Sequence, residues 1–434
     1  MGVLARHYKE DKFRIMYFVF ILLGTAQLSA WNALISAADF FSKRLPTTQA
    51  MNLLLIMCNV GCIPVMIITT IFSSDIDYIT FTALPLLLMG IVMICTPLIC
   101  TFLANTYIAL VLMMLISFIC GVASGITNCS IFGLGAIFSG DASGGIMVGQ
   151  GIAGLISLIP LVLHLAIPGD NTDISGLIFF SFGSILNILA LVSLILFRIL
   201  PHPRYVIWKH QMAINPSAVP LMQNSPYVDD DISVLSQELV ETRASQPLTK
   251  LGKAKQFAKE TVVVTKKLGW WAVSVFVVYG LTLTLYPSVI LAIPPPNGMF
   301  ATEWSSSLWT HIKINIFCVA DFISRWLGDC VAVYKSTRMI VIITFLRFVL
   351  AAFLFLALWV KWMRNLVFFI IIYSLFSLSN GYHGTVIMAH ANTQCNLSPH
   401  ELGLGGSVMS MLLNIGIAVG CVLALPLGLI KPIP

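Results

Sequence analysis

The residues best suited to chemistry lie in the segment 317–329, FCVADFISRWLGD, where Asp321, Arg325 and Asp329 interrupt an apolar run. Spacings of three and four residues place Cys318 and these three charges along one face of a helix. A carboxylate accepts hydrogen bonds and a guanidinium donates them in a fork, so the pair has the chemistry to bind a polar solute. A buried ion pair that locks helices together is the alternative. We favour solute binding, because buried pairs are weak evidence for stability.

A second deep charge, Arg347, lies in the apolar segment ITFLRFVLAAF. It has two candidate roles, as part of the solute site or as the structural partner of an acid such as Asp321, and we favour the structural role. His164, His383 and His390 also have apolar neighbours in the sequence. Each is either a proton relay or a hydrogen-bonded contact between helices, and the second interpretation is favoured.

Polar side chains also interrupt the apolar segments of the N-terminal half. The stretch from Gly121 to Gly154 is rich in Gly, Ala and Ser, which let helices pack closely, either rigidly or with sliding. It contains the amides of Asn128 and Gln150, which combine donor and acceptor as the recognition of a nucleobase edge requires. Trp31 and Asn32 offer either a stacking face over a planar ligand or an interfacial anchor with a cap.

The elements that carry these residues must lie in a membrane. Of the 434 residues, 58% are hydrophobic and 10% are charged, and the mean hydropathy is +0.93. Apolar stretches long enough to cross the hydrocarbon core of a bilayer recur along the chain. The sequence therefore predicts an all-α integral membrane protein, in which every buried charge needs a functional or structural reason.

About eleven transmembrane helices are predicted from apolar spans bounded by Pro, Gly and charge. Their expected limits are 13–37, 49–73, 79–102, 105–139, 143–168, 175–200, 268–293, 308–334, 336–361, 364–390 and 403–430. One long polar stretch, 201–267, contains prolines and charges and is expected to be a largely disordered loop. It divides the chain into a six-helix bundle, 1–200, and a five-helix bundle, 268–434.

The basic residues predict the orientation. The N-terminal leader is basic, and residues 198–267 contain ten of the twenty-four lysines and arginines. Both segments are therefore expected in the cytosol, and an odd number of spans places the C-terminus outside. Two basic pairs, Lys43–Arg44 and Lys361/Arg364, fall on the other side. The net charge of +6 reports this orientation and gives no reason to expect nucleic acid as a partner.

Taken together, these segments resemble the equilibrative nucleoside transporter family. The similarity rests on WN at 31–32, NCSIFGLG at 128–135, IMVGQGIAG at 146–154 and DFISRWLGD at 321–329, with LRFVL at 346–350 and SNGYHG at 379–384 in support. It covers nearly the whole chain. No single motif is specific, and the ordered set carries the resemblance.

The resemblance implies a major-facilitator-like bundle that moves nucleosides, and in some members nucleobases, down their gradient by alternating access. It implies that Trp31 lies near the central site, that Asn128 contacts the base, and that Asp321 and Arg325 contact the ribose hydroxyls. Arg347 corresponds to a family arginine that supports the neighbouring helices. The chain departs from the family where Ala30 replaces a common proline, where Asn128 replaces a glutamine, and where the helix of Arg347 lacks a nearby proline.

Four functions compete. A facilitative nucleoside transporter comes first, with Asn32, Gln150 and Arg347 supporting its site. A solute-binding receptor without transport, or a proton-coupled nucleoside transporter, is the alternative. A membrane enzyme is disfavoured, because no nucleophile, metal ligand set or phosphate loop accompanies the charges. We expect no cofactor or metal, a monomer in the lipid bilayer of the plasma membrane, and purine nucleosides among the substrates.

Overall fold

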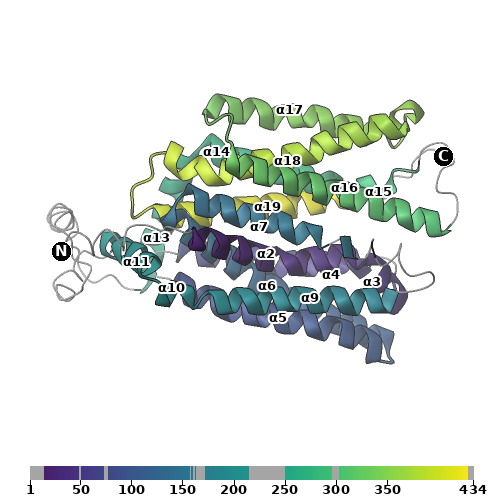
Figure 1. Ribbon diagram of the computed structural model, residues 1–434, viewed down its shortest axis with the longest axis horizontal. Helices are drawn as coiled ribbons and strands as arrows, with labels where there is room; N and C mark the ends of the chain where they lie inside the picture. The colour runs from purple at the N-terminus through teal and green to yellow at the C-terminus, as the bar shows by residue number, and fades with distance from the viewer. Residues whose placement is uncertain are drawn as a thin grey trace.

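The structure is a computed structural model that describes residues 14–47, 50–72, 77–156, 158–159, 162, 172–214, 250–295 and 303–428. Throughout these ranges the secondary structure is helical, and the long helices run side by side as one elongated bundle (Figure 1). Each helix satisfies its own backbone hydrogen bonds, which is the condition for crossing a bilayer. The expected all-helical chain is confirmed.

The helices of the N-terminal half begin with one near the start of the described chain. They are α2 (Ile15–Ser36), α3 (Ala38–Arg44), α4 (Ala50–Ile71), α5 (Tyr78–Phe102), α6 (Thr106–Phe138), α7 (Gly140–Leu155), α9 (Thr172–Ser193) and α10 (Leu196–Ile199).

The C-terminal half follows two helices that lie between the halves in the sequence, α11 (Pro201–Ile214) and α13 (Lys250–Leu268). Its helices are α14 (Trp270–Leu285), α15 (Ser288–Ala292), α16 (Glu303–Cys330), α17 (Thr337–Leu356), α18 (Leu366–Gln394) and α19 (Leu402–Gly428), with a 3₁₀ turn at Lys361–Arg364.

Polar caps explain where several helices begin. Asp77, Asn105, Ser139, Ser336 and Asn365 each accept a hydrogen bond from a backbone N–H in the first turn of the helix that follows. Ser139 also separates two helices, because α6 ends just before it and α7 begins just after it. The boundary between α6 and α7 therefore lies at Ser139.

Within the described ranges, nine helices are long and apolar enough to cross a membrane. The helices α7 and α16 are not among them. The described part of α7 has 16 residues, and α16 carries the charges of Asp321, Arg325 and Asp329. Both nevertheless pack inside the bundle, α7 against α2 and α16, and α16 against α18.

Three hydrophobic cores show how the halves are joined. The largest lies at the end where α2 begins and combines both halves, with Phe20, Phe132 and Ile146 from one and Trp271, Val386 and Val408 from the other. The second core draws only on the N-terminal half, from Ala30 to Phe180. The third draws only on the C-terminal half, from Leu285 to Phe376. The described halves therefore share a core at one end and have separate cores at the other.

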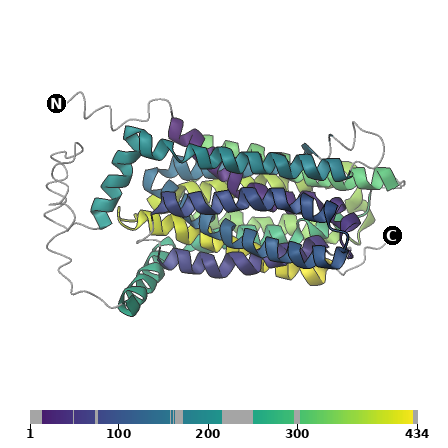
Figure 2. The ribbon, with the colours of Figure 1, turned by 90° about the horizontal axis from the view of Figure 1, so that it is seen from below.

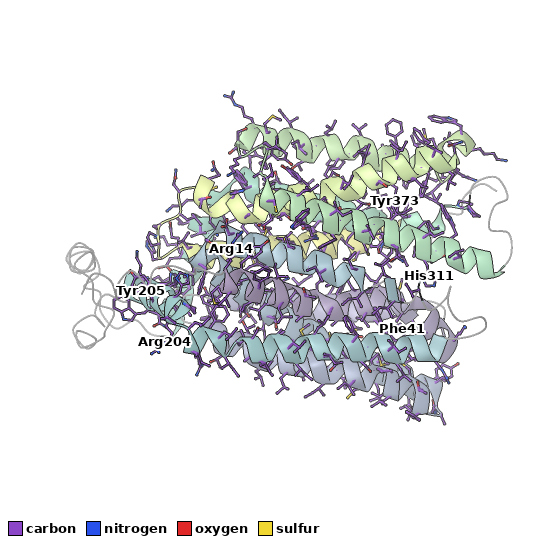
Figure 3. All side chains as sticks on the ribbon, in the orientation of Figure 1. Arg14, Phe41, Arg204, Tyr205, His311 and Tyr373 are labelled. Atoms are coloured by element: carbon purple, nitrogen blue, oxygen red, sulfur yellow. The ribbon has the colours of Figure 1, made fainter. Side chains whose placement is uncertain are left out.

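The polar stretch 201–267 begins and ends in helix. Figure 2 shows α11 and α13 leaving the bundle obliquely at the end where the chain begins. Figure 3 places Arg14, Arg204 and Tyr205 toward this same end, with Phe41, His311 and Tyr373 toward the opposite one. Residues 215–249, on which most of the predicted disordered loop falls, lie outside the described residues.

Candidate functional site

The centre of the site is the ion pair on α16. Arg325 Nε donates to Asp321 Oδ2 at 2.6 Å, across one turn of the same helix. Both residues are buried, with 7% of Asp321 and 4% of Arg325 exposed. A charge pair so far from solvent needs further hydrogen bonds to satisfy its remaining donors and acceptors. The structure supplies these from both halves of the chain.

The C-terminal half holds the carboxylate. Asn380 Nδ2, on α18, donates to Asp321 Oδ1 at 2.7 Å. The side-chain oxygen Oδ1 of Asn380 accepts in turn from the hydroxyl of Thr282, on α14, at 2.8 Å. Arg347 Nη2, on α17, donates to the same hydroxyl oxygen at 2.7 Å. Three helices, α14, α17 and α18, are thus linked to the carboxylate on α16, and Arg347 reaches it only through the neutral side chains of Thr282 and Asn380.

Arg347 bonds to Thr282 and Asn380 and makes no ion pair with Asp321 in the structure. Its guanidinium also lies over the ring of Phe376, 5.1 Å from the centroid, and only 1% of the residue is exposed. Its contacts connect α17 to α14 and α18. Arg347 therefore contacts Asp321 only indirectly and positions it through Thr282 and Asn380.

The guanidinium of Arg325 reaches into the N-terminal half. Its Nη1 lies 3.3 Å from the carbonyl oxygen of Met147 and 3.4 Å from Gln150 Oε1, both on α7. The close approach depends on Gly151, where an added Cβ would lie 2.9 Å from Arg325 Cδ. Arg325 therefore bonds to Asp321 within its own half and to α7 across the boundary between the halves.

The network continues through the N-terminal half. Gln150 Nε2 donates to Gln27 Oε1 at 2.9 Å, and Gln27 Nε2 donates to Ser124 Oγ at 3.2 Å. These bonds join α7, α2 and α6. All the side chains involved are buried or half-buried, so the site is a continuous row of polar groups through an apolar bundle.

The structure places the other predicted site residues one helical turn from this row. Asn128 follows Ser124 by four residues on α6, and Trp31 follows Gln27 by four residues on α2. Asn128 is 2% exposed. Its Oδ1, like Nδ2 of Asn32, is buried without a hydrogen-bond partner among the described residues. Such groups are costly unless something pairs with them.

Sequence reasoning missed Gln27, Ser124, Thr282 and Asn380. Gln27 had a detectable signal, since it is an amide in an apolar helix exactly one turn before Trp31. Asn380 lies in the SNGYHG segment, which supported the resemblance without a role for its amide. Ser124 and Thr282 are small hydroxyl residues of a kind common in membrane helices, so only the fold distinguishes them.

His383 is a contact between helices. Its Nδ1 lies 2.8 Å from the hydroxyl of Tyr334, and its Nε2 lies 2.8 Å from the hydroxyl of Thr344. Thr344 also donates to the carbonyl oxygen of Ile340, so its oxygen accepts from Nε2–H. His390 is half-buried, and His164 lies outside the described residues.

Asp329 is separate from the pair, although it shares the face of α16. It accepts a hydrogen bond from the hydroxyl of Tyr17, on α2, at the end with the shared core. Its carboxylate lies against Gly144, on α7, where an added Cβ would overlap Oδ1. Nearby, Arg14 pairs with Asp141 at 3.6 Å. Asp329 therefore joins the two halves at one end and takes no part in the central row.

Comparison with known proteins gives a consistent result. The family model described as nucleoside transporter matches residues 112–428. Equilibrative nucleoside transporter 1 of Rattus norvegicus is 22% identical, over 96% of this chain and 98% of its own. Equilibrative nucleotide transporter 8 of Arabidopsis thaliana is 23% identical, over 95% of each chain.

Solved structures share the fold. The proton:xylose symporter XylE, of the major facilitator superfamily, matches with a TM-score of 0.60 at 12% identity, over 94% of this chain and 86% of its own. A crystal structure of the nucleoside transporter NupG matches with a TM-score of 0.53 at 13% identity, over 94% and 89%. The bundle is therefore major-facilitator-like.

Proposed function

The chain belongs to the nucleoside transporter family, and on that premise we propose that it moves nucleosides across a membrane, down their gradient, by alternating access. The family match over residues 112–428 carries this proposal. The buried row of polar groups supports it, because it contains a carboxylate, a guanidinium and amides at the boundary between two halves. The chain is a transporter, and no enzymatic step is part of its function.

The proposed architecture has eleven transmembrane helices. The helices α7 and α16 would join the nine that are apolar enough to be recognised by composition. Residues 1–200 would then form a six-helix bundle and residues 268–434 a five-helix bundle. Residues 201–267, helical at each end, would connect them on the cytosolic side.

The proposed orientation places the N-terminus in the cytosol and the C-terminus outside the cell. Most of the exposed basic side chains at helix ends support it, because they gather at the end where the chain begins. We assign the protein to the plasma membrane as a monomer embedded in the lipid bilayer. In this orientation the halves would share a hydrophobic core at the cytosolic end and have separate hydrophobic cores at the outer end.

The proposed site binds a nucleoside between the halves. Asp321 accepts hydrogen bonds from the ribose hydroxyls and Arg325 donates to the sugar, while Asn128 reads the base and Trp31 stacks on it. Asn32, Gln150 and Arg347 support these four. The bound sugar would compete for the donors of Arg325 that now bond to Met147 and Gln150 on α7. Binding would thereby alter a contact between the halves, which is what a transport cycle requires.

Uptake by the purified protein in liposomes tests the proposal. Labelled adenosine and uridine should accumulate until the inside and outside concentrations are equal, with the same end point with or without a pH gradient. Accumulation above equality on imposing a pH gradient would indicate proton coupling. Binding without uptake would indicate a receptor and overturn the proposal. Labelled adenine in the same assay decides whether nucleobases are also carried.

A further inference from the structure

Helix α13 has two opposite faces of different chemistry. Its inner face consists of Phe257, Thr261, Val264 and Leu268, which recur at the spacing of one side of a helix and pack toward the bundle. Val264 and Leu268 are each 1% exposed. Phe257 contacts Phe72, the residue after α4, edge-on, with 6.1 Å between ring centroids. The inner face fixes α13 to the bundle.

The outer face combines lysines with apolar side chains. Lys255, Lys259 and Lys266 are exposed, and their spacings of four and seven residues align them along one stripe. Val262, 53% exposed, lies within the stripe. None of the three ammonium groups makes an ion pair with any described residue. Lys267, by contrast, lies outside this stripe and pairs with Glu401.

The fold holds this stripe beside the membrane. Only Gly269, with φ +49°, separates the end of α13 from the start of α14, the first span of the C-terminal half. Trp270 is 54% exposed at this junction, and exposed tryptophans are typical of the membrane–water interface. Figure 2 shows α13 inclined away from the bundle axis at this end. The lysines therefore lie within reach of lipid headgroups.

We propose that the outer face of α13, defined by Lys255, Lys259, Val262 and Lys266, binds the headgroups of anionic phospholipids. Lysines next to a membrane span attract anionic lipids by about 1 kcal/mol each, and an exposed valine beside them adds apolar contact with the acyl chain region. A soluble acidic partner would use the lysines alone. The position beside Trp270 favours the lipid, which is present at this depth without any recruitment.

Spin-labelled lipids test the proposal directly in liposomes of phosphatidylcholine. Each bound headgroup contacts about one lysine of the stripe, so labelled phosphatidylserine should associate with the wild-type protein about fivefold more strongly than labelled phosphatidylcholine, the factor that corresponds to 1 kcal/mol. High salt should reduce it, because exposed charges are screened. No nucleoside is present, so the result does not depend on transport.

Matched variants assign the preference to the stripe. Lys255→Gln, Lys259→Gln and Lys266→Gln together should bring the ratio close to one, whereas the same three positions changed to Arg should retain it. Lys209→Gln, Lys335→Gln and Arg338→Gln remove the same charge from exposed positions at the same end and should leave most of the preference. Equal losses in both glutamine triples, or a wild-type ratio of one, would overturn the proposal. A wild-type ratio of one would leave the stripe as a surface for a soluble partner.

Discussion

At the scale of single residues, Asp321 is the group on which the proposed site depends. Its two oxygens accept from Arg325 and Asn380, so both are already oriented for a ligand that brings hydroxyl donors. Pre-positioned acceptors lose little freedom on binding. They also penalise a ligand that lacks the matching hydroxyl, because a buried polar group is then left unpaired.

We therefore expect the wild-type protein to prefer adenosine over its deoxyribose counterpart by about 5- to 100-fold, since each missing hydrogen bond costs about 1–3 kcal/mol. Asp321→Asn keeps the shape, removes the charge, and should shrink this ratio. Thr344→Val is the control, because it removes a buried hydroxyl of α17 whose described partners are His383 and the backbone of Ile340, and it leaves Asp321 and Asn380 in place. It should lower thermal stability with the ratio nearly unchanged. Uptake ratios at matched protein abundance decide, and an intact ratio in Asp321→Asn would return the pair to a scaffolding role.

Asn128 has a different signature, a buried oxygen with no partner among the described residues. If the amide reads the nucleobase, Asn128→Leu should change the order of adenosine, inosine and uridine in competition for uptake. Thr127→Val is the neighbouring control, because the hydroxyl of Thr127 bonds only to the backbone of its own helix, at Ala123. That variant should keep the order. An equal fall for all three nucleosides in Asn128→Leu would contradict a role in base recognition.

At the scale of helices, sequence reasoning located the membrane segments better than it related them to one another. Each of the eleven expected segments overlaps a helix of the structure, because apolar periodicity and caps such as Asn105 are local signals. The pairing of Asp321 with Arg325 was equally local. The bond from Arg325 to Gln150 was not, since 175 residues separate the two. Partners such as Asn380 and Thr282 depend on tertiary packing, which no local pattern encodes.

The end of the bundle near α13 shows a local charge effect on stability. Burial alone would raise the pKa of Glu401, but hydrogen bonds from Lys267 and Ser398 lower it to about 2. Because this folded-state pKa is below the usual value of about 4.3, the stabilisation is complete above that value and is lost as the pH falls toward 2.

Glu401→Gln should accordingly lower the free energy of unfolding by about 1–2 kcal/mol at pH 7, after allowance for the solvent exposure of Lys267. The difference from wild type should shrink as the pH falls below about 4.5. Thermal unfolding in detergent across this range measures it. His210, whose pKa burial lowers to about 4, titrates in both proteins and cancels in the comparison. A difference that is constant with pH would show that the ion pair contributes nothing.

At the scale of the whole molecule, the shared core joins the two halves at one end, and we expect this end to be the closed side of the proposed transport cycle. Gly144 lets α7 approach the carboxylate of Asp329 at this end. An added Cβ would displace this carboxylate, so Gly144→Ala should break the hydrogen bond from Tyr17 that joins the halves here and shift the population toward states open on that side.

Spin labels at the exposed positions Phe18 and Val333, in protein with Cys330 replaced by Ser, report the separation of the halves at this end. Gly144→Ala should add a longer distance to the distribution. In Gly90→Ala, the matched control, the new Cβ would meet the nearest atom at 3.5 Å, an ordinary contact, and the distribution should not change. Identical distributions in Gly144→Ala and wild type would show that this end is not closed by the glycine contact.

The glycines at helix crossings have a consequence for inheritance. At Gly121 and Gly149 an added Cβ would overlap the backbone of the facing helix, at Cys58 O and Ile21 O respectively. Every other amino acid carries a Cβ, so no missense change in these codons is conservative. Inactivating alleles in a population should therefore concentrate at these codons, far more densely than at the lipid-facing leucines and valines between them. A saturation mutagenesis screen for nucleoside uptake would display this as a short list of positions that accept only synonymous codons.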